Sequence, residues 1–156
     1  TAQTAQDLLA WLEADSNYIP LISRESYDVA AKPSERAAAI HAQNPDLMYP
    51  FMKLCAGGST ASGFECYPSV PGRTWHKESY YFARQLAEKM QQAGAKLRGH
   101  GGIRYIYYQA DKTAGGIEPH RGTGRTELTL LEDVDCPAVL AEQCFVTSEE
   151  DVVQFG

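Results

Sequence analysis

The sequence has no long hydrophobic run and none of the residue biases that mark a fibrous or membrane protein. No apolar run approaches the ~18 residues that a membrane-spanning helix needs, and no charged start followed by an apolar segment indicates a signal peptide. Hydrophobic residues make up 44% and charged residues 22% of the 156 residues. These proportions are typical of globular chains and exclude a disordered tail, a collagen-like fibre and a coiled coil. The length predicts one domain with a core of its own.

The sequence also has few basic residues. It contains 14 lysines and arginines against 20 aspartates and glutamates, which gives a formal net charge of -6. A chain with this charge is repelled by phosphate backbones and by anionic membrane surfaces. We therefore expect neither a nucleic-acid partner nor a membrane span.

Cysteine is scarce, and its spacing matches no metal-binding motif. The four cysteines, Cys55, Cys66, Cys136 and Cys144, form no C-x-x-C pair, whereas zinc-ribbon sites are built from such pairs. Cys136 and Cys144 flank an apolar run, where a free cysteine behaves as a small buried hydrophobe. Reduced, buried thiols are the favoured interpretation, and an oxidised pair is the alternative.

Helical and strand patterns alternate along the chain. Apolar residues at helical spacing predict helices over residues 5–12, 33–43 and 78–93, and a capping-box-like pattern opens another helix at Ser148. Short apolar runs predict strands over residues 18–22, 47–54, 63–67, 127–131 and 138–144. The glycine-rich stretch 98–125 is predicted to be a long loop or hairpin around a β-rich island at 103–108. This alternation indicates a single α/β domain with a mostly parallel central sheet flanked by helices.

Four stretches carry more distinctive patterns, in order along nearly the whole chain. They are Leu21-Ile22-Ser23-Arg24, a helix that leads into Asn44-Pro45-Asp46-Leu47, the strand Gly63-Phe64-Glu65-Cys66-Tyr67, and Pro137-Ala138-Val139-Leu140-Ala141-Glu142 followed by Ser148-Glu149-Glu150-Asp151. Together they resemble the catalytic domain of zinc-dependent N-acetylmuramoyl-L-alanine amidases, bacterial and phage enzymes that trim cell-wall peptidoglycan. The resemblance covers residues 1–156 as one amidase-like α/β domain that lacks the family's first strand and most of its last helix. Because the chain begins with Thr1 and not with Met, we expect a leader or an upstream segment to have been removed.

The resemblance implies a hydrolase that cleaves the amide between N-acetylmuramic acid and L-Ala, with peptidoglycan or muropeptide as its partner and zinc as its cofactor. Zinc lowers the pKa of bound water towards ~7 and polarises the carbonyl, while a carboxylate moves the proton to the departing amine. On this resemblance Glu142 is the catalytic residue, at the family's general-base position. The alternative is a strand-end carboxylate that pairs with Lys53 or Arg24. The implied location is the bacterial cell wall or the outside of the cell, or a phage-encoded lysin that acts on the wall.

The metal ligands of that family are not found in this sequence. Its first ligand His and its Glu ligand precede the part of the family that the chain resembles, and Met52, followed by Lys53, stands where the second His is expected. A thioether is a poor substitute for imidazole on zinc, and an ammonium repels a divalent cation. Cys55 is the nearest substitute donor, although a small strand-end residue is its simpler interpretation. We therefore assign no metal ligand, and interpret the four histidines as helical or loop residues with local or solvent contacts: His41, His76, His100 and His120.

Two explanations of the missing ligands stay open, namely a fragment of a longer zinc amidase and a degenerate relative that has lost the metal. The alternative function is a non-catalytic domain that binds the cell wall or another protein. An unrelated hydrolase with Cys55 as nucleophile ranks last, because Cys55 has no flanking signature of such an enzyme. The amidase interpretation makes one geometric prediction. Strands 47–54 and 138–144 should be neighbours in the interior of the sheet, with Met52 and Glu142 at the same edge.

Overall fold

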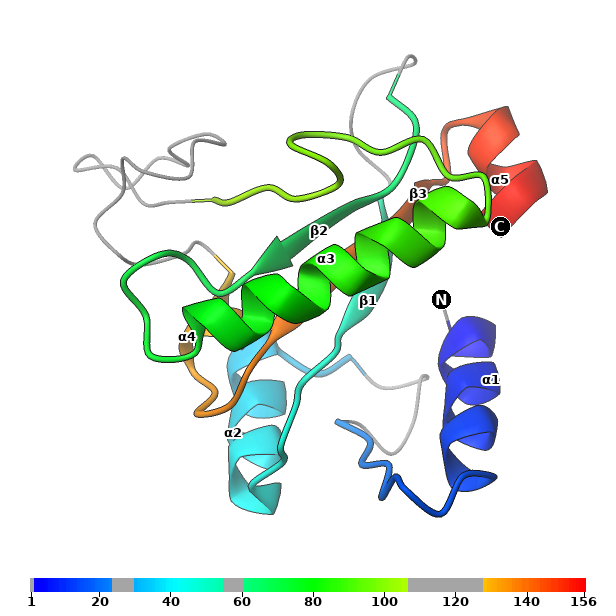
Figure 1. Ribbon diagram of the computed structural model, residues 1–156. Helices are drawn as coiled ribbons and strands as arrows, with labels where there is room; N and C mark the ends of the chain where they lie inside the picture. The colour runs from blue at the N-terminus through cyan, green and yellow to red at the C-terminus, as the bar shows by residue number, and fades with distance from the viewer. Residues whose placement is uncertain (1, 24–29, 55–60, 107–127) are drawn as a thin grey trace.

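In the described part of the chain, three strands form one sheet between helices (Figure 1). The computed structural model describes residues 2–23, 30–54, 61–106 and 128–156. In chain order the elements are α1 (Ala2–Glu13), α2 (Pro33–Gln43), β1 (Phe51–Leu54), β2 (Glu65–Pro68), α3 (His76–Gln92), α4 (Thr129–Glu132), β3 (Val139–Phe145) and α5 (Glu149–Phe155). None of the helices in these ranges has the length and apolar character needed to span a bilayer. The expected single α/β domain is confirmed.

Strand β3 lies at the centre of the sheet. It pairs with β1 in parallel and with β2 in antiparallel orientation, so the strand order is β1-β3-β2. The predicted adjacency of strands 47–54 and 138–144 is confirmed, although β1 is an edge strand among the described residues. The expectation of a mostly parallel sheet is not confirmed, because one of the two pairings is antiparallel. A nearly continuous apolar run indicates a strand that is covered on both faces. Helices cover both faces of β3, so its apolar sequence does not reveal whether its neighbours are parallel or antiparallel.

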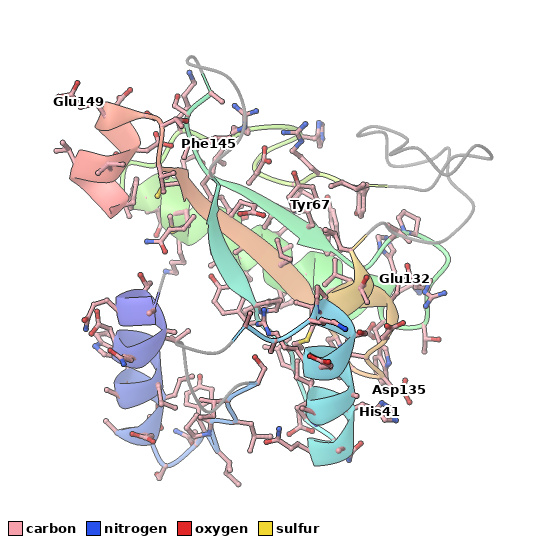
Figure 2. The ribbon with its side chains drawn as sticks, turned by 180° about the vertical axis from the view of Figure 1, so that it is seen from behind. His41, Tyr67, Glu132, Asp135, Phe145 and Glu149 are labelled. Atoms are coloured by element: carbon pink, nitrogen blue, oxygen red, sulfur yellow. The ribbon has the colours of Figure 1, made fainter. Side chains whose placement is uncertain are left out.

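Two apolar clusters cover the two faces of β3. Val139 and Ala141 pack into the cluster that includes residues of α3, whereas Ala138 and Leu140 pack into the cluster that includes residues of α2 and α4. This division follows from the strand itself, because successive side chains point to opposite faces. Figure 1 shows α3 lying along one face of the sheet, and Figure 2 shows α2 and α4 from the other side, beside the end at which β3 begins. Glu142 is the middle residue of β3, two positions beyond Leu140, which packs into the cluster of α2 and α4.

The cysteines follow the favoured interpretation. The three that the structure describes, Cys66, Cys136 and Cys144, are buried and form no disulfide among the described residues. Cys55 lies outside the described residues. Burial raises the pKa of the Cys66 thiol to about 12, and the nearby Glu65 charge adds to the shift. Cys66 is therefore a core residue and not a nucleophile.

Three helices begin or end at the residues that the sequence indicates. Pro33 opens α2, where its missing N–H costs nothing, and Asn44 ends that helix with a left-handed backbone at φ 47°. Gly94 follows α3 at φ 96°, the conformation that favours glycine just after a helix. At the start of α5 the Ser148 hydroxyl accepts a hydrogen bond from the N–H of Asp151, as the capping-box-like pattern predicts.

Two predicted strands are wrong, and a third β segment is smaller than expected. Residues 18–22 have no regular structure, and Ile19 is 88% exposed; this short run contains Pro20, which cannot donate to a neighbouring strand. Residues 129–132 form α4. The adjacent Leu130 and Leu131 both pack toward α2, which one helical turn permits and an alternating strand does not. Of the island at 103–108, the described part makes only isolated β-bridges at Ile103.

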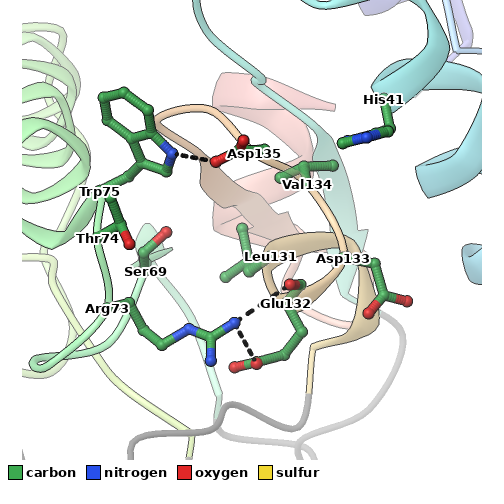
Figure 3. Close-up of a pocket in the computed structure, with 10 residues that line it drawn as sticks. All are labelled: His41, Ser69, Arg73, Thr74, Trp75, Leu131, Glu132, Asp133, Val134 and Asp135. Carbon is green, nitrogen blue, oxygen red and sulfur yellow. Dashed lines mark hydrogen bonds and ion pairs between the residues drawn. The ribbon is translucent and has the colours of Figure 1, made fainter.

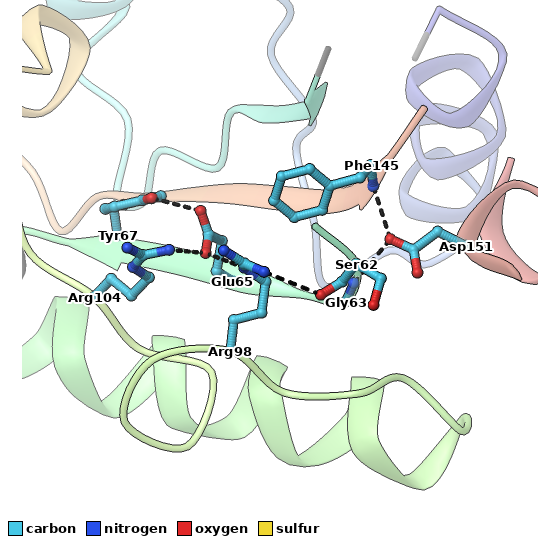
Figure 4. Close-up of polar contacts among 8 residues, drawn as sticks. All are labelled: Ser62, Gly63, Glu65, Tyr67, Arg98, Arg104, Phe145 and Asp151. Carbon is cyan, nitrogen blue, oxygen red and sulfur yellow. Dashed lines mark hydrogen bonds and ion pairs between the residues drawn. The ribbon is translucent and has the colours of Figure 1, made fainter. Parts of the chain in front are cut away.

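Asp151 joins α5 to the sheet (Figure 4). Its buried carboxylate oxygen Oδ2 accepts hydrogen bonds from the backbone N–H of Gly63 at 2.8 Å and of Phe145 at 2.9 Å. Gly63 precedes β2, and Phe145 ends β3. A single carboxylate thus fixes the last helix against two strands at the end of the sheet where Glu142 lies.

Candidate functional site

Glu142 lies within the central strand, between two register partners. Met52 of β1 is opposite it on one side, and Glu65 of β2 is opposite it on the other. Met52 and Glu142 therefore lie side by side, as predicted, although Glu142 is in the middle of β3 and not at its end. Glu142 is only 5% exposed, so its carboxyl has lost most of its contact with water.

Three hydrogen bonds fix the neighbouring carboxylate of Glu65 (Figure 4). The Tyr67 hydroxyl donates to Oε1 at 2.7 Å, Arg98 Nε donates to Oε2 at 2.8 Å, and Arg104 Nη1 also donates to Oε2. Burial alone would raise the pKa of Glu65, but these hydrogen bonds and the Arg104 charge outweigh burial and hold the pKa below its usual value. Glu65 is therefore ionised at neutral pH, and two guanidinium groups balance its charge.

Glu142 has no comparable partners. Its Oε2 atom is buried and makes no hydrogen bond within the part of the chain that the structure describes. Burial in the first place, and then the negative charge of Glu65, raise the pKa of Glu142 to about 7. A carboxyl with a pKa near the working pH can both accept and donate a proton. Two carboxyls whose pKa values are pushed apart can take different roles, and Glu142 is the one suited to proton transfer.

The described residues around Glu142 do not fit a zinc site. Within residues 2–23, 30–54, 61–106 and 128–156, no group of three or more His, Cys, Asp or Glu residues could hold a metal ion. Met52 occupies the strand position opposite Glu142, and its thioether is a soft ligand unsuited to hydrolytic zinc. The oxygens of Glu65 already accept hydrogen bonds from Tyr67 and two arginines. The zinc that the family implies has no set of ligands among these residues.

The described histidines have local or solvent surroundings, as predicted. His41 is exposed on α2, and His100 is exposed in the turn after Arg98. His76 Nδ1 lies 2.8 Å from the carbonyl oxygen of Ser69 at the start of α3. His120 and Cys55, the other candidate donors, lie outside the described residues.

Arg98 and Arg104 are the site residues that the sequence reasoning missed. The segment around them folds back beside β2, because Arg98 N donates to the Phe64 carbonyl at 2.9 Å and Arg104 N donates to the Cys66 carbonyl at 3.0 Å. Gly99 permits the turn, since it adopts φ 59° and a Cβ there would lie 2.7 Å from a backbone oxygen. The available signal was Glu65 itself, a charged residue inside an apolar strand, which needs buried partners.

A separate pocket of about 270 Å³ lies between the start of α3 and α4 (Figure 3). Arg73 forms an ion pair with Glu132 at 2.9 Å, and Trp75 Nε1 donates to Asp135 at 2.9 Å. Neither Glu142 nor Glu65 lines it. The sequence did not indicate this pocket, because its facing walls come from residues as far apart as Trp75 and Asp135, which are 60 positions apart.

The chain is similar to one family of known sequence. A family model described as N-acetylmuramoyl-L-alanine amidase matches residues 1–155. A search of curated proteins gave no match.

Solved structures with this fold include three proteins of low sequence identity to this chain. The N-acetylmuramoyl-L-alanine amidase from Clostridium difficile 630 is 18% identical with a TM-score of 0.72, over 97% of this chain and 68% of that one. Cwp6 from Clostridium difficile is 23% identical with a TM-score of 0.63, over 85% and 18%. The catalytic domain of CwlV, an N-acetylmuramoyl-L-alanine amidase from Bacillus (Paenibacillus) polymyxa var. colistinus, is 17% identical with a TM-score of 0.65, over 94% and 66%. These likenesses show the fold, and the chain spans between 18% and 68% of the three lengths.

The surroundings of Glu142 predict that the protein loses stability as pH rises from about 4.5 to about 7. The pKa of Glu142 is about 7 in the folded chain against 4.5 for a free carboxyl, so the folded state binds this proton more tightly. Its stabilising contribution is complete at low pH and is lost as pH passes through the folded value. Urea unfolding at about pH 5 and at about pH 8 measures how much the free energy of unfolding decreases between the two. This decrease should be about 1–3 kcal/mol smaller in Glu142→Gln than in the wild type. Equal losses in the two proteins would mean that Glu142 does not titrate in this range.

Proposed function

The chain belongs to the N-acetylmuramoyl-L-alanine amidase family, and on that basis we propose that it is a peptidoglycan-directed, amidase-like domain whose proton-transfer residue is Glu142. One observation carries the proposal: a buried carboxyl oxygen to which no described residue donates a hydrogen bond, on the central strand, at the position that the resemblance assigns to the general base. The partner is peptidoglycan or a muropeptide. The place of action is the bacterial cell wall, reached from outside the cell or by a phage-encoded lysin.

The difference in pKa between Glu142 and Glu65 supports Glu142 as the proton-transfer residue. Hydrolysis of the amide between muramic acid and L-Ala needs a group that takes a proton from water and returns it to the departing amine. The pKa of about 7 suits Glu142 to both steps. Glu65 is unsuited to them, because three hydrogen bonds hold it ionised. Glu65 fixes charge and geometry, and Glu142 exchanges the proton.

A second candidate is a domain that binds peptidoglycan without cleaving it. Members of the family depend on zinc, and the donors described in this chain do not fit zinc. The specific observation in favour is Met52, which occupies the strand position opposite Glu142 where the resemblance expects an imidazole. The chain as it stands is therefore expected to keep the recognition surface and to lack turnover.

Metal content and turnover separate the two candidates. We expect the purified chain to hold well under one zinc per chain and to release no L-Ala-peptide from muropeptides, measured by elemental analysis and chromatography. Met52→His with Lys53→Ala supplies one imidazole and removes one ammonium, and it should still show little activity, because one ligand does not make a zinc site. Stoichiometric zinc in the unmodified chain, removable by a chelator with loss of hydrolysis, would contradict this expectation. In that case Glu142→Gln should abolish turnover and leave zinc bound.

Co-sedimentation with purified peptidoglycan sacculi tests the recognition that both candidates share. We expect the chain to co-sediment, and Glu142→Ala to weaken binding about five- to tenfold, because a buried hydrogen-bonding group is lost. The matched control is Asp133→Ala, which removes an exposed carboxylate from the pocket between α3 and α4 and should bind like the wild type. Thermal melting establishes that both variants fold. A wild-type chain that stays in solution would refute the proposed function.

A further inference from the structure

Two buried polar atoms on side chains that flank Glu65 have no hydrogen-bond partner among the residues that the structure describes. One is Oε2 of Glu142, and the other is Nε of Arg104. Both side chains flank the same carboxylate: Arg104 Nη1 binds Glu65, and Glu142 is the register partner of Glu65 on the next strand. Arg104 and Glu142 also both act electrostatically on the Tyr67 hydroxyl. The two atoms thus belong to one small polar site around Glu65 and Tyr67.

The two arginines that bind Glu65 differ in what their other nitrogens do. Arg98 donates from Nε to Glu65 and from Nη1 to the Ser62 carbonyl at 3.3 Å, and its guanidinium lies 4.6 Å from the centre of the Phe145 ring. Arg104 binds Glu65 through Nη1 and keeps Nε–H free among the described residues. The contacts of Arg98 are therefore all with other parts of the fold. Arg104 is held in place by Glu65, and its Nε–H has no partner among the described residues (Figure 4).

Together these observations place, on the two sides of Glu65, one donor and one carboxyl oxygen that no described residue binds. Buried polar groups normally have hydrogen-bond partners, so a free donor and a free acceptor in one site indicate a binding partner with the complementary pair. An amide is such a group, because its carbonyl accepts and its N–H donates. A carboxylate fits less well, since it would bring a further negative charge beside Glu65 and Glu142.

We infer that Arg104 is a substrate-binding residue, whose Nε–H holds the carbonyl of the muramoyl–L-Ala amide while Glu142 Oε2 meets the N–H side of the same amide. This inference rests on the proposed function. It adds Arg104 as a binding residue and the amide carbonyl as the group that Arg104 recognises. Glu65 acts on the substrate only through Arg104, as a positioning residue.

Paired lysine variants test the assignment. Arg104→Lys and Arg98→Lys each keep a positive charge for Glu65, but only Arg104→Lys removes the spare Nε–H. Calorimetric titration with muramyl dipeptide should show about tenfold weaker binding for Arg104→Lys and a smaller loss for Arg98→Lys, which disturbs the Glu65 network but removes no free donor. Equal effects of the two substitutions, or no effect of either with wild-type binding intact, would overturn the inference and leave the proposed function standing.

A second measurement needs no variant and therefore does not depend on how the variants fold. In the NMR spectrum of the wild-type chain, muramyl dipeptide should shift the Nε–H resonance of Arg104 and leave that of Arg98 in place. N-acetylmuramic acid carries a carboxylate where muramyl dipeptide carries the amide, and it should bind more weakly and shift Arg104 less. Equal binding of the two compounds would show that the site recognises a group other than the amide. A wild-type chain that binds neither muramyl dipeptide nor sacculi would overturn both the inference and the proposed function.

Discussion

The site depends on one buried carboxylate, that of Glu65, and on the three hydrogen bonds that keep it ionised. Tyr67 supplies one of them from the same strand, and Arg98 and Arg104 supply the others from a segment that the chain reaches only after α3. A buried charge without partners is costly, so Glu65 requires this segment to fold back against β2. The same charge lies opposite Glu142 in the register and favours the protonated form of that residue. One ion-pair network therefore sets a loop conformation and adds to the effect of burial, which is the larger cause, on the proton affinity of Glu142.

The buried carboxyl of Glu142 lowers the stability of the folded chain. Asp151 Oδ2 accepts two backbone hydrogen bonds, whereas the buried Glu142 Oε2, like Arg104 Nε, makes none in the described part of the chain. An unsatisfied buried polar group destabilises a protein by about 1–3 kcal/mol, and such groups concentrate where a ligand completes them. Together with membership of the amidase family, this unsatisfied oxygen supports our proposal that peptidoglycan is bound at Glu142 on β3, and not in the pocket between α3 and α4.

Local signals in the sequence predicted the elements with strong periodicity or clear end residues. Pro33, Asn44, Gly94 and Ser148 act through their own backbone and neighbours, and all four mark helix ends as expected. The run at 18–22 and the leucines of α4 were misassigned, because apolar character alone does not reveal whether a strand partner exists. The neighbouring positions of strands 47–54 and 138–144 were predicted, and the structure adds the pairing of Met52 with Glu142. The bonds from Glu65 to Arg98 and Arg104 span 33 and 39 residues, and no local pattern encodes such contacts.

The central claim is that the substrate amide is bound at Glu142 on β3. The most direct measurement is a crystal structure of the chain with muramyl dipeptide. We expect the muramoyl–L-Ala amide to lie within hydrogen-bonding distance of Glu142 Oε2, at about 2.7–3.2 Å, with the Glu65 network intact. Muramyl dipeptide seated instead between Trp75 and Asp133, with Glu142 unchanged and still enclosed, would contradict it.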